Sequence, residues 1–167
     1  MYKTAEKAAQ AVFVLILLSN LVIGQTFQHN FDDAKKLAAE TNRPIALVFS
    51  GSDWCKPCIQ LRTTVLEDSS FVEFADKNLV LVEVDFPYKK ANRLSKEQQA
   101  HNEKLAEQYN KQGAFPLVVL ADATGNVKGE FGYDQRLPVS GYIQKIEKMI
   151  GGEASIVKTD ATVSDSK

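Results

Sequence analysis

Two cysteines lie three positions apart in the run Trp54-Cys55-Lys56-Pro57-Cys58. The pattern around them predicts a helix from near Cys55 to about Leu66, because proline is tolerated in a first helical turn. A helix N-terminus offers unpaired N–H groups and a partial positive charge, and Lys56 adds a cation, so the pKa of the Cys55 thiol is expected to lie below about 8.5. Cys55, at an exposed tip, is the expected nucleophile, and Cys58, one turn further, is expected to resolve a mixed disulfide.

Other interpretations of the cysteine pair are a structural disulfide or half of a zinc site. A disulfide across so short a loop adds little stabilisation, and a structural zinc site needs four ligands. The two histidines, His29 and His101, do not complete a ligand set by their spacing, and surface or capping positions suit them better. Trp54 is interpreted either as a core aromatic residue or as a substrate contact.

The elements that must position this motif follow from apolar periodicity. Continuous or alternating apolar runs predict strands over residues 45–49, 79–85, 117–121 and 127–132, the last two joined as a hairpin by a turn at 122–126. Helical spacing predicts helices over residues 31–41, 55–66, 96–111 and 139–150, with a short amphipathic turn at 71–75. A βαβ unit followed by a hairpin and a helix gives an α/β fold: a central mixed sheet of four or five strands with helices on both faces.

Two motifs together resemble the thioredoxin superfamily, and more narrowly the exported bacterial thioredoxin-like proteins. The first is the strand followed by residues 53–58, and the second is Gly113-Ala114-Phe115-Pro116 opening a strand. The similarity extends over about residues 27–150. It implies a thioredoxin fold with a cis peptide bond between Phe115 and Pro116, packed against the cysteines. It also implies that backbone before this proline pairs with an extended substrate; the alternative is a trans proline that begins a strand.

The chain departs from the thioredoxin pattern near the cysteines. Phe49 stands where thioredoxin has a buried aspartate, so the usual proton acceptor for the resolving thiol is missing. Glu83, which interrupts an apolar strand, is a possible substitute, or else a carboxylate at a strand end. Phe115 is bulkier than the usual residue before the proline, and Lys56-Pro57 replaces Gly-Pro.

These features predict a thiol–disulfide oxidoreductase that reduces disulfides in extracytoplasmic proteins. Such a reductase needs a membrane-embedded electron donor, since the compartment is otherwise kept oxidising. The alternatives are an oxidase or isomerase using the same dithiol, and a non-catalytic binding module. The redox disulfide is the expected active group, with no metal, nucleotide or other cofactor, and a net charge of −1 points to no nucleic-acid partner.

The ends of the chain differ in composition from its middle. Residues 1–24 resemble a signal peptide, with Lys3 and Lys7 before an apolar run, although an uncleaved membrane anchor is the alternative. Residues 25–150 form the expected domain, and residues 151–167 are small and polar, as in a disordered tail. The expected location is therefore the periplasm or the exterior.

Overall fold

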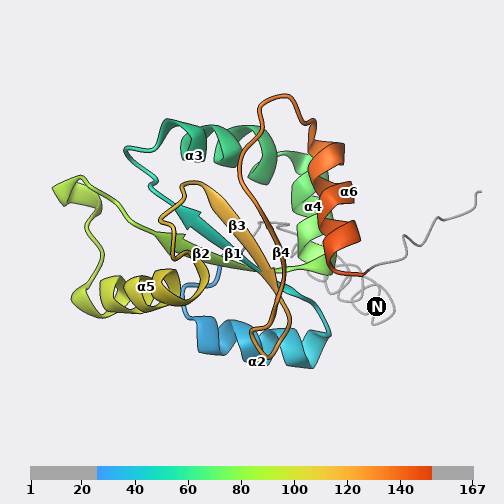
Figure 1. Ribbon diagram of the computed structural model, residues 1–167, viewed down its shortest axis with the longest axis horizontal. Helices are drawn as coiled ribbons and strands as arrows, with labels where there is room; N and C mark the ends of the chain where they lie inside the picture. Colours follow the sequence, from blue (N-terminus) through green and yellow to red (C-terminus); the bar gives the residue numbers. More distant parts are fainter. Residues whose placement is uncertain (1–25, 152–167) are drawn as a thin grey trace, which may run out of the picture.

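Four strands form one mixed sheet in the computed structural model, which describes residues 26–151 (Figure 1). The strands are β1 (Ile45–Ser50), β2 (Val80–Asp85), β3 (Leu117–Ala121) and β4 (Val127–Phe131). Their order across the sheet is β2-β1-β3-β4, with β1 parallel to β2 and antiparallel to β3. All six residues of β1 are buried, as expected for a central strand covered on both faces.

Helices cover both faces of the sheet. They are α2 (Phe31–Thr41), α3 (Lys56–Leu61), α4 (Ser69–Asn78), α5 (Lys96–Tyr109) and α6 (Val139–Met149). The α3 helix continues directly into a π-helical turn, η1 (Arg62–Leu66), and a short 3-10 helix, η2 (Lys90–Asn92), interrupts the loop between β2 and α5. Side chains of Asn30, Asp68 and Ser95 accept hydrogen bonds from backbone N–H groups at the starts of α2, α4 and α5.

Successive side chains of β1 point to opposite faces of the sheet and so contribute to two separate apolar layers. Ala46 and Val48 face α3, η1, α4 and α6, where Leu61, Val65 and Tyr142 are buried. Ile45, Leu47 and Phe49 face α2 and α5 on the other side. Figure 1 shows α3 and α2 on opposite sides of the sheet. The position of α3 is thus fixed by the sheet face on which it packs.

The thioredoxin-like α/β fold confirms the sequence-based prediction, with four strands in the sheet. The prediction was incomplete after Leu66, where α4 is a full helix of 10 residues rather than a short turn. The Asp68 side chain accepts a hydrogen bond from Ser70 N–H at 2.9 Å and so begins that helix. The signal peptide expected at 1–24 and nearly all of the tail expected at 151–167 lie outside the described residues. Within residues 26–151 no helix has the length and apolar character needed to cross a bilayer.

The β2 edge of the sheet carries a short additional pairing. Gln28 forms a parallel bridge with Val82, its N–H donating to Leu81 O at 2.8 Å and its carbonyl accepting from Glu83 N–H at 2.9 Å. The segment before α2 therefore lies along the outside of β2.

Candidate active site

The two cysteines lie where β1 turns into α3. Backbone N–H of Cys55 donates to Gly51 O at 2.9 Å, which closes a turn after the strand. Cys55 is the N-cap of α3, and its sulfur accepts a hydrogen bond from Cys58 N–H at 3.3 Å. The two sulfurs are joined in a disulfide, with the Cα atoms 5.2 Å apart. A sulfur thus occupies the position where helix N–H groups favour negative charge.

The disulfide is more enclosed than the sequence suggested. Cys55 is 6% exposed and Cys58 3%, so the expected exposed tip is instead a buried position for Cys55 in the disulfide form. Its backbone hydrogen bond to Gly51 folds it back beneath the turn. Lys56 and Pro57 are exposed beside it, and Pro57 occupies the first turn of α3, as expected.

Trp54 is an exposed residue rather than a core residue, with 51% of its surface accessible. Its indole N–H donates to Phe86 O at 2.7 Å, and its ring lies against Gly51. A Cβ atom at Gly51 would be only 2.3 Å from the indole ring, so the close approach requires glycine. The accessible indole next to the disulfide favours the substrate-contact interpretation.

An aromatic cluster extends the site toward the proline loop. The Phe115 ring packs edge-on against Trp54 at 5.6 Å and against Phe86 at 5.5 Å between centroids. The peptide bond between Phe115 and Pro116 is cis. Phe115 therefore lies in a wall of the site shared by three separate segments of the chain, and its bulk is accommodated by contacts with the other two aromatic rings.

Asp53, which sequence reasoning placed only in a loop, joins this motif to the segment after β2. Its carboxylate accepts hydrogen bonds from the backbone N–H groups of Tyr88 and Lys89, at 2.8 and 2.9 Å, and from the Asn92 side chain at 2.9 Å. These donors, the Tyr88 N–H first, lower the pKa of Asp53. The partners are 35 or more positions away, so local spacing gives no signal of the contact.

A second polar connection supports the same region. The Asp85 carboxylate accepts from Ser52 N–H at 2.8 Å and from its hydroxyl at 2.6 Å. The buried Asn102 side chain of α5 donates to Asp85 O at 2.8 Å and accepts from Gln98. The active-site turn is therefore fixed to the end of β2, and β2 in turn to α5.

The residues considered for proton transfer lie in different environments. Phe49 is fully buried in the layer under α2 and α5. Glu83 is partly exposed, and its carboxylate pairs with Arg62, one turn after Cys58. His29 lies 3.8 Å from the other carboxylate oxygen of Glu83. The role of Glu83 as a proton acceptor stays a prediction, now with Arg62 as its defined partner.

The histidines hold positions of the kind expected for surface or capping residues. His101 accepts a hydrogen bond from Phe31 N–H at 3.2 Å, at the start of α2, and the His29 side chain is 62% exposed. Across residues 26–151, no group of three His, Cys, Asp or Glu side chains is arranged to hold a metal ion.

Known proteins share both the sequence pattern and the fold. The model of a thioredoxin-like domain family matches residues 31–136. The disulfide bond reductase DsbH of Chlamydia pneumoniae is 36% identical over 123 residues, which cover 72% of this chain and 70% of that protein. A solved DsbH oxidoreductase superposes with a TM-score of 0.69 at 32% identity, covering 80% of this chain and 90% of the other. A thioredoxin from Thermus thermophilus shares the fold alone, with a TM-score of 0.56 at 19% identity over 76% of this chain and 88% of its own.

Proposed function

Because the chain belongs to the thioredoxin-like family, we propose that it is a disulfide reductase that acts on other proteins through Cys55 and Cys58. The observation that carries the proposal is the Cys55–Cys58 disulfide at the start of α3, beside an accessible Trp54. The similarity to a disulfide bond reductase over most of both chains supports the reducing direction.

The proposed reaction begins with the reduced dithiol. The Cys55 thiolate attacks one sulfur of a client disulfide, the client S–S bond breaks, and the released client thiolate takes up a proton. Cys58 then loses its proton and attacks the Cys55 sulfur, which breaks the mixed disulfide and releases the second client thiol. Two electrons pass to the client, and the chain is left with the Cys55–Cys58 disulfide.

The remaining site residues have supporting roles in this proposal. The helix N-terminus and Lys56 stabilise the Cys55 thiolate, and Pro57 fixes the first turn. Trp54 and Phe115 form the apolar wall beside the sulfurs, and backbone before Pro116 pairs with the extended client.

We propose that the reaction takes place outside the cytoplasm, in the periplasm or beyond it. The signal-like pattern of residues 1–24 supports this location, and so does the similarity to a protein named in the Dsb series. Each cycle consumes one reduced dithiol, so an external dithiol donor, in the membrane on this proposal, must restore it.

Insulin reduction tests the function directly. Wild type with a chemical dithiol donor is expected to precipitate the insulin B chain, and Cys55→Ser is expected to remain at the uncatalysed rate. Cys58→Ser is expected to accumulate mixed disulfides, which mass spectrometry identifies. Equal rates for wild type and Cys55→Ser would instead support a binding module. A reduction potential near −120 mV would support an oxidase.

A further inference from the structure

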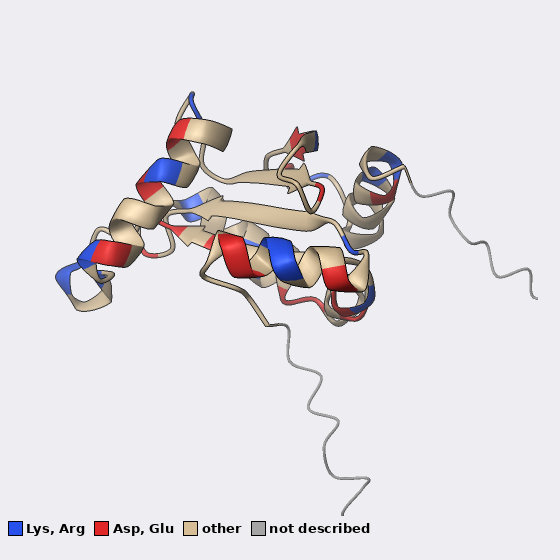
Figure 2. Cartoon of the chain, turned by 90° about the horizontal axis from the view of Figure 1, so that it is seen from below, with Lys and Arg blue, Asp and Glu red and all other residues tan. Residues whose placement is uncertain are grey.

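The segment between β2 and α5 carries an unusual charge for this chain. Residues 86–96 contain four basic residues, Lys89, Lys90, Arg93 and Lys96, and no acidic residue, whereas the whole chain has a net charge of −1. All four basic residues are exposed. None of the four forms a salt bridge within the part of the chain that the structure describes. Figure 2 shows blue ribbon on this loop and at the adjoining start of α5.

The acidic residues next to this segment already have partners. The Asp53 carboxylate accepts three hydrogen bonds from the loop itself, and that of Asp85 accepts two from Ser52. Glu97 interacts with its own backbone N–H and with Ser95 at the start of α5, and both contacts lower its pKa. Asp53 also interacts electrostatically with Lys89. The four basic side chains nevertheless remain exposed, and none is held in a salt bridge among residues 26–151.

A groove runs along the same loop. It encloses about 530 Å³, and its lining includes apolar surfaces of Phe86, Tyr88 and Leu94 and the cations Arg93 and Lys96. Asp85 also lines it, and the carboxylate of Asp85 is bound by Ser52. Tyr88 is 83% exposed, the most accessible large apolar side chain among residues 26–151. An exposed aromatic side chain held by its backbone beside a hollow is typical of a binding surface.

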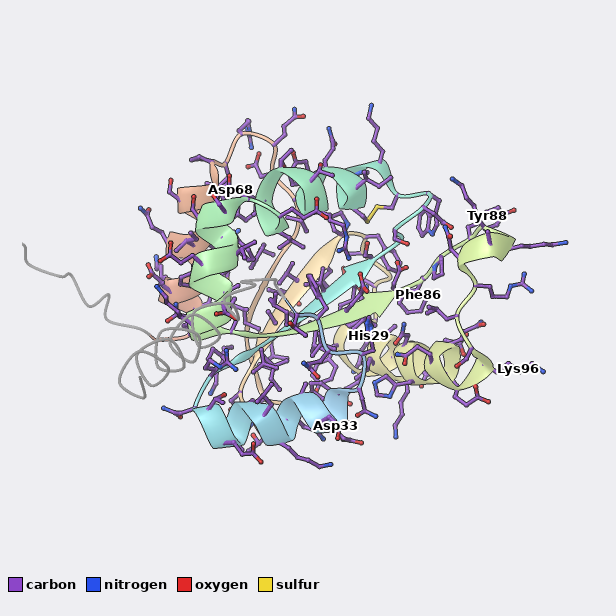
Figure 3. All side chains as sticks on the ribbon, turned by 180° about the vertical axis from the view of Figure 1, so that it is seen from behind. His29, Asp33, Asp68, Phe86, Tyr88 and Lys96 are labelled. Atoms are coloured by element: carbon purple, nitrogen blue, oxygen red, sulfur yellow. A yellow bond between two sulfur atoms is a disulfide. The ribbon has the colours of Figure 1, made fainter. Side chains whose placement is uncertain are left out.

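Phe86 connects the groove to the aromatic cluster beside the active-site motif. The Phe86 ring lines the groove and packs against Phe115, and its carbonyl accepts the hydrogen bond of Trp54. Figure 3 shows Phe86, Tyr88 and Lys96 on the same end of the molecule as the yellow disulfide bond, and Figure 1 places the loop beside the start of α3. A polypeptide that presents its disulfide to Cys55 can therefore continue into the groove.

We propose that this groove binds an acidic, extended segment of the client polypeptide that lies next to the client's disulfide. The inference rests on the proposed function and adds a substrate class to it. Arg93 and Lys96 in the groove attract the carboxylates of the client, assisted by Lys89 and Lys90 on the adjoining part of the loop. The apolar surfaces of the groove bury an apolar side chain of the same segment. Asp53 is the positioning residue, since it attaches the loop to the turn that holds Trp54 and Cys55.

Two disulfide-bridged peptides that differ only in a run of glutamates or glutamines beside one cysteine test the inference. The reduced full-length protein is mixed with each peptide in a single turnover, and the second-order rate constant is measured. For wild type we expect the glutamate peptide to react about tenfold faster at low salt, because attraction between opposite charges raises association rates. This ratio should fall toward one as salt shortens the screening length from about 10 Å at 0.1 M to about 3 Å at 1 M.

Matched charge-removal variants assign the effect to the groove. The triple variant Lys89→Gln, Arg93→Gln, Lys96→Gln removes both cations that line the groove and one beside it, and is expected to bring the ratio of the two rate constants close to one. The control triple variant Lys104→Gln, Lys111→Gln, Lys148→Gln removes the same charge from exposed positions on and after α5 and on α6, and is expected to keep the wild-type ratio.

Four results would contradict the inference, and one of them would also contradict the proposed function. If wild type reduces both peptides at the same rate, it has no preference for acidic clients, but it is still a reductase. If wild type reduces neither peptide, the proposed function itself is contradicted. If the groove variant keeps the wild-type ratio of the two rate constants, the acidic preference arises from another part of the protein. The remaining result concerns membranes. If wild type but not the groove variant sediments with anionic phospholipid vesicles, and wild type does not discriminate between the peptides, the cations bind a membrane surface instead.

Discussion

At the scale of single residues, the site depends on a few close contacts that are not interchangeable. Gly51 provides the surface on which the Trp54 ring lies, and the indole N–H on that side of the ring donates to Phe86 O. The accessible face of Trp54 is left toward solvent beside the disulfide. One small residue thus determines how the largest side chain of the motif is presented.

Replacing Gly51 with alanine is expected to displace the Trp54 indole. The new methyl group would overlap the ring, so the hydrogen bond to Phe86 O is lost, at a cost of about 0.5–1.5 kcal/mol in the free energy of unfolding. Trp54 is the only tryptophan of the chain, and a red shift of its fluorescence emission reports the displacement. Gly141→Ala, where the added methyl meets the Leu137 side chain instead, is the matched control. Unchanged emission in Gly51→Ala would contradict the packing described.

Glu83 offers a second test at this scale. If it accepts the Cys58 proton, Glu83→Gln slows release of the client from the mixed disulfide by about a hundredfold, the usual size of a general-base contribution. Stopped-flow measurement of that step across pH checks the prediction, with the exposed Glu130→Gln as control. An unchanged rate and pH profile, together with lower stability, would make Glu83 only the ion-pair partner of Arg62.

At the scale of elements, sequence reasoning succeeded where a signal is local. The strands at 45–49 and 117–121 are continuous apolar runs, and the structure buries them completely. The α4 helix was underestimated because its buried apolar residues are only Phe71 and Ala75, and its start depends on the Asp68 cap. The π-helical turn after α3 has no local sequence pattern that distinguishes it from an α-helix.

The difference between local and long-range signals also explains which parts of the active site could be predicted from the sequence. Cys55 and Cys58 were recognised because their chemistry depends on adjacent residues and on one helix start. The contacts of Asp53 with Tyr88 and of Phe86 with Phe115 join segments distant in sequence, so only the folded chain reveals them. The groove beside the disulfide could not be derived without them.

The β3–β4 turn allows a prediction about pH. The Asp122 carboxylate accepts hydrogen bonds from the Thr124 hydroxyl at 2.5 Å and from Asn126 N–H at 3.0 Å, and pairs with Lys128 at 3.0 Å, and these partners lower its pKa strongly. A carboxylate whose pKa is lower in the folded state than in the unfolded state stabilises the fold at pH values above its unfolded pKa of about 3.9. This stabilisation is lost progressively as the pH falls from the unfolded pKa toward the lower folded pKa. Asp122→Asn is therefore expected to lower the melting temperature at neutral pH, by an amount that shrinks in acid.

Thermal unfolding of wild type and Asp122→Asn from pH 7 down to pH 2 measures this difference. Asp76→Asn changes an exposed carboxylate on α4 and is the control, with little effect expected at any pH. A melting-temperature difference that grows in acid would contradict the assigned hydrogen bonds.

At the scale of the whole molecule, β1 connects the two apolar layers, because its alternate residues enter opposite sides. Leu47 is fully buried toward α2 and α5, and Leu120 of the neighbouring β3 is fully buried toward α3, α4 and α6. Since both layers share the same sheet, neither is expected to unfold without the other.

Leu47→Ala and Leu120→Ala test this coupling from the two sides. Each is expected to lower the free energy of unfolding by about 2–5 kcal/mol, the usual range for a buried leucine truncated to alanine. Urea unfolding followed by tryptophan fluorescence and by circular dichroism should give coincident single transitions for both variants. Separate transitions in either variant would show that the layers are independent.

The bridge between Gln28 and Val82 also determines how the molecules behave when concentrated. An edge strand with unpaired backbone N–H and C=O groups can pair with strands of neighbouring copies, which leads to fibres. Gln28 occupies two such groups on the outer side of β2, and Lys128 and Glu130 place charges along β4 at the opposite rim. Both edges of the sheet therefore disfavour the addition of strands from neighbouring copies, and the protein is expected to resist fibre formation at high concentration.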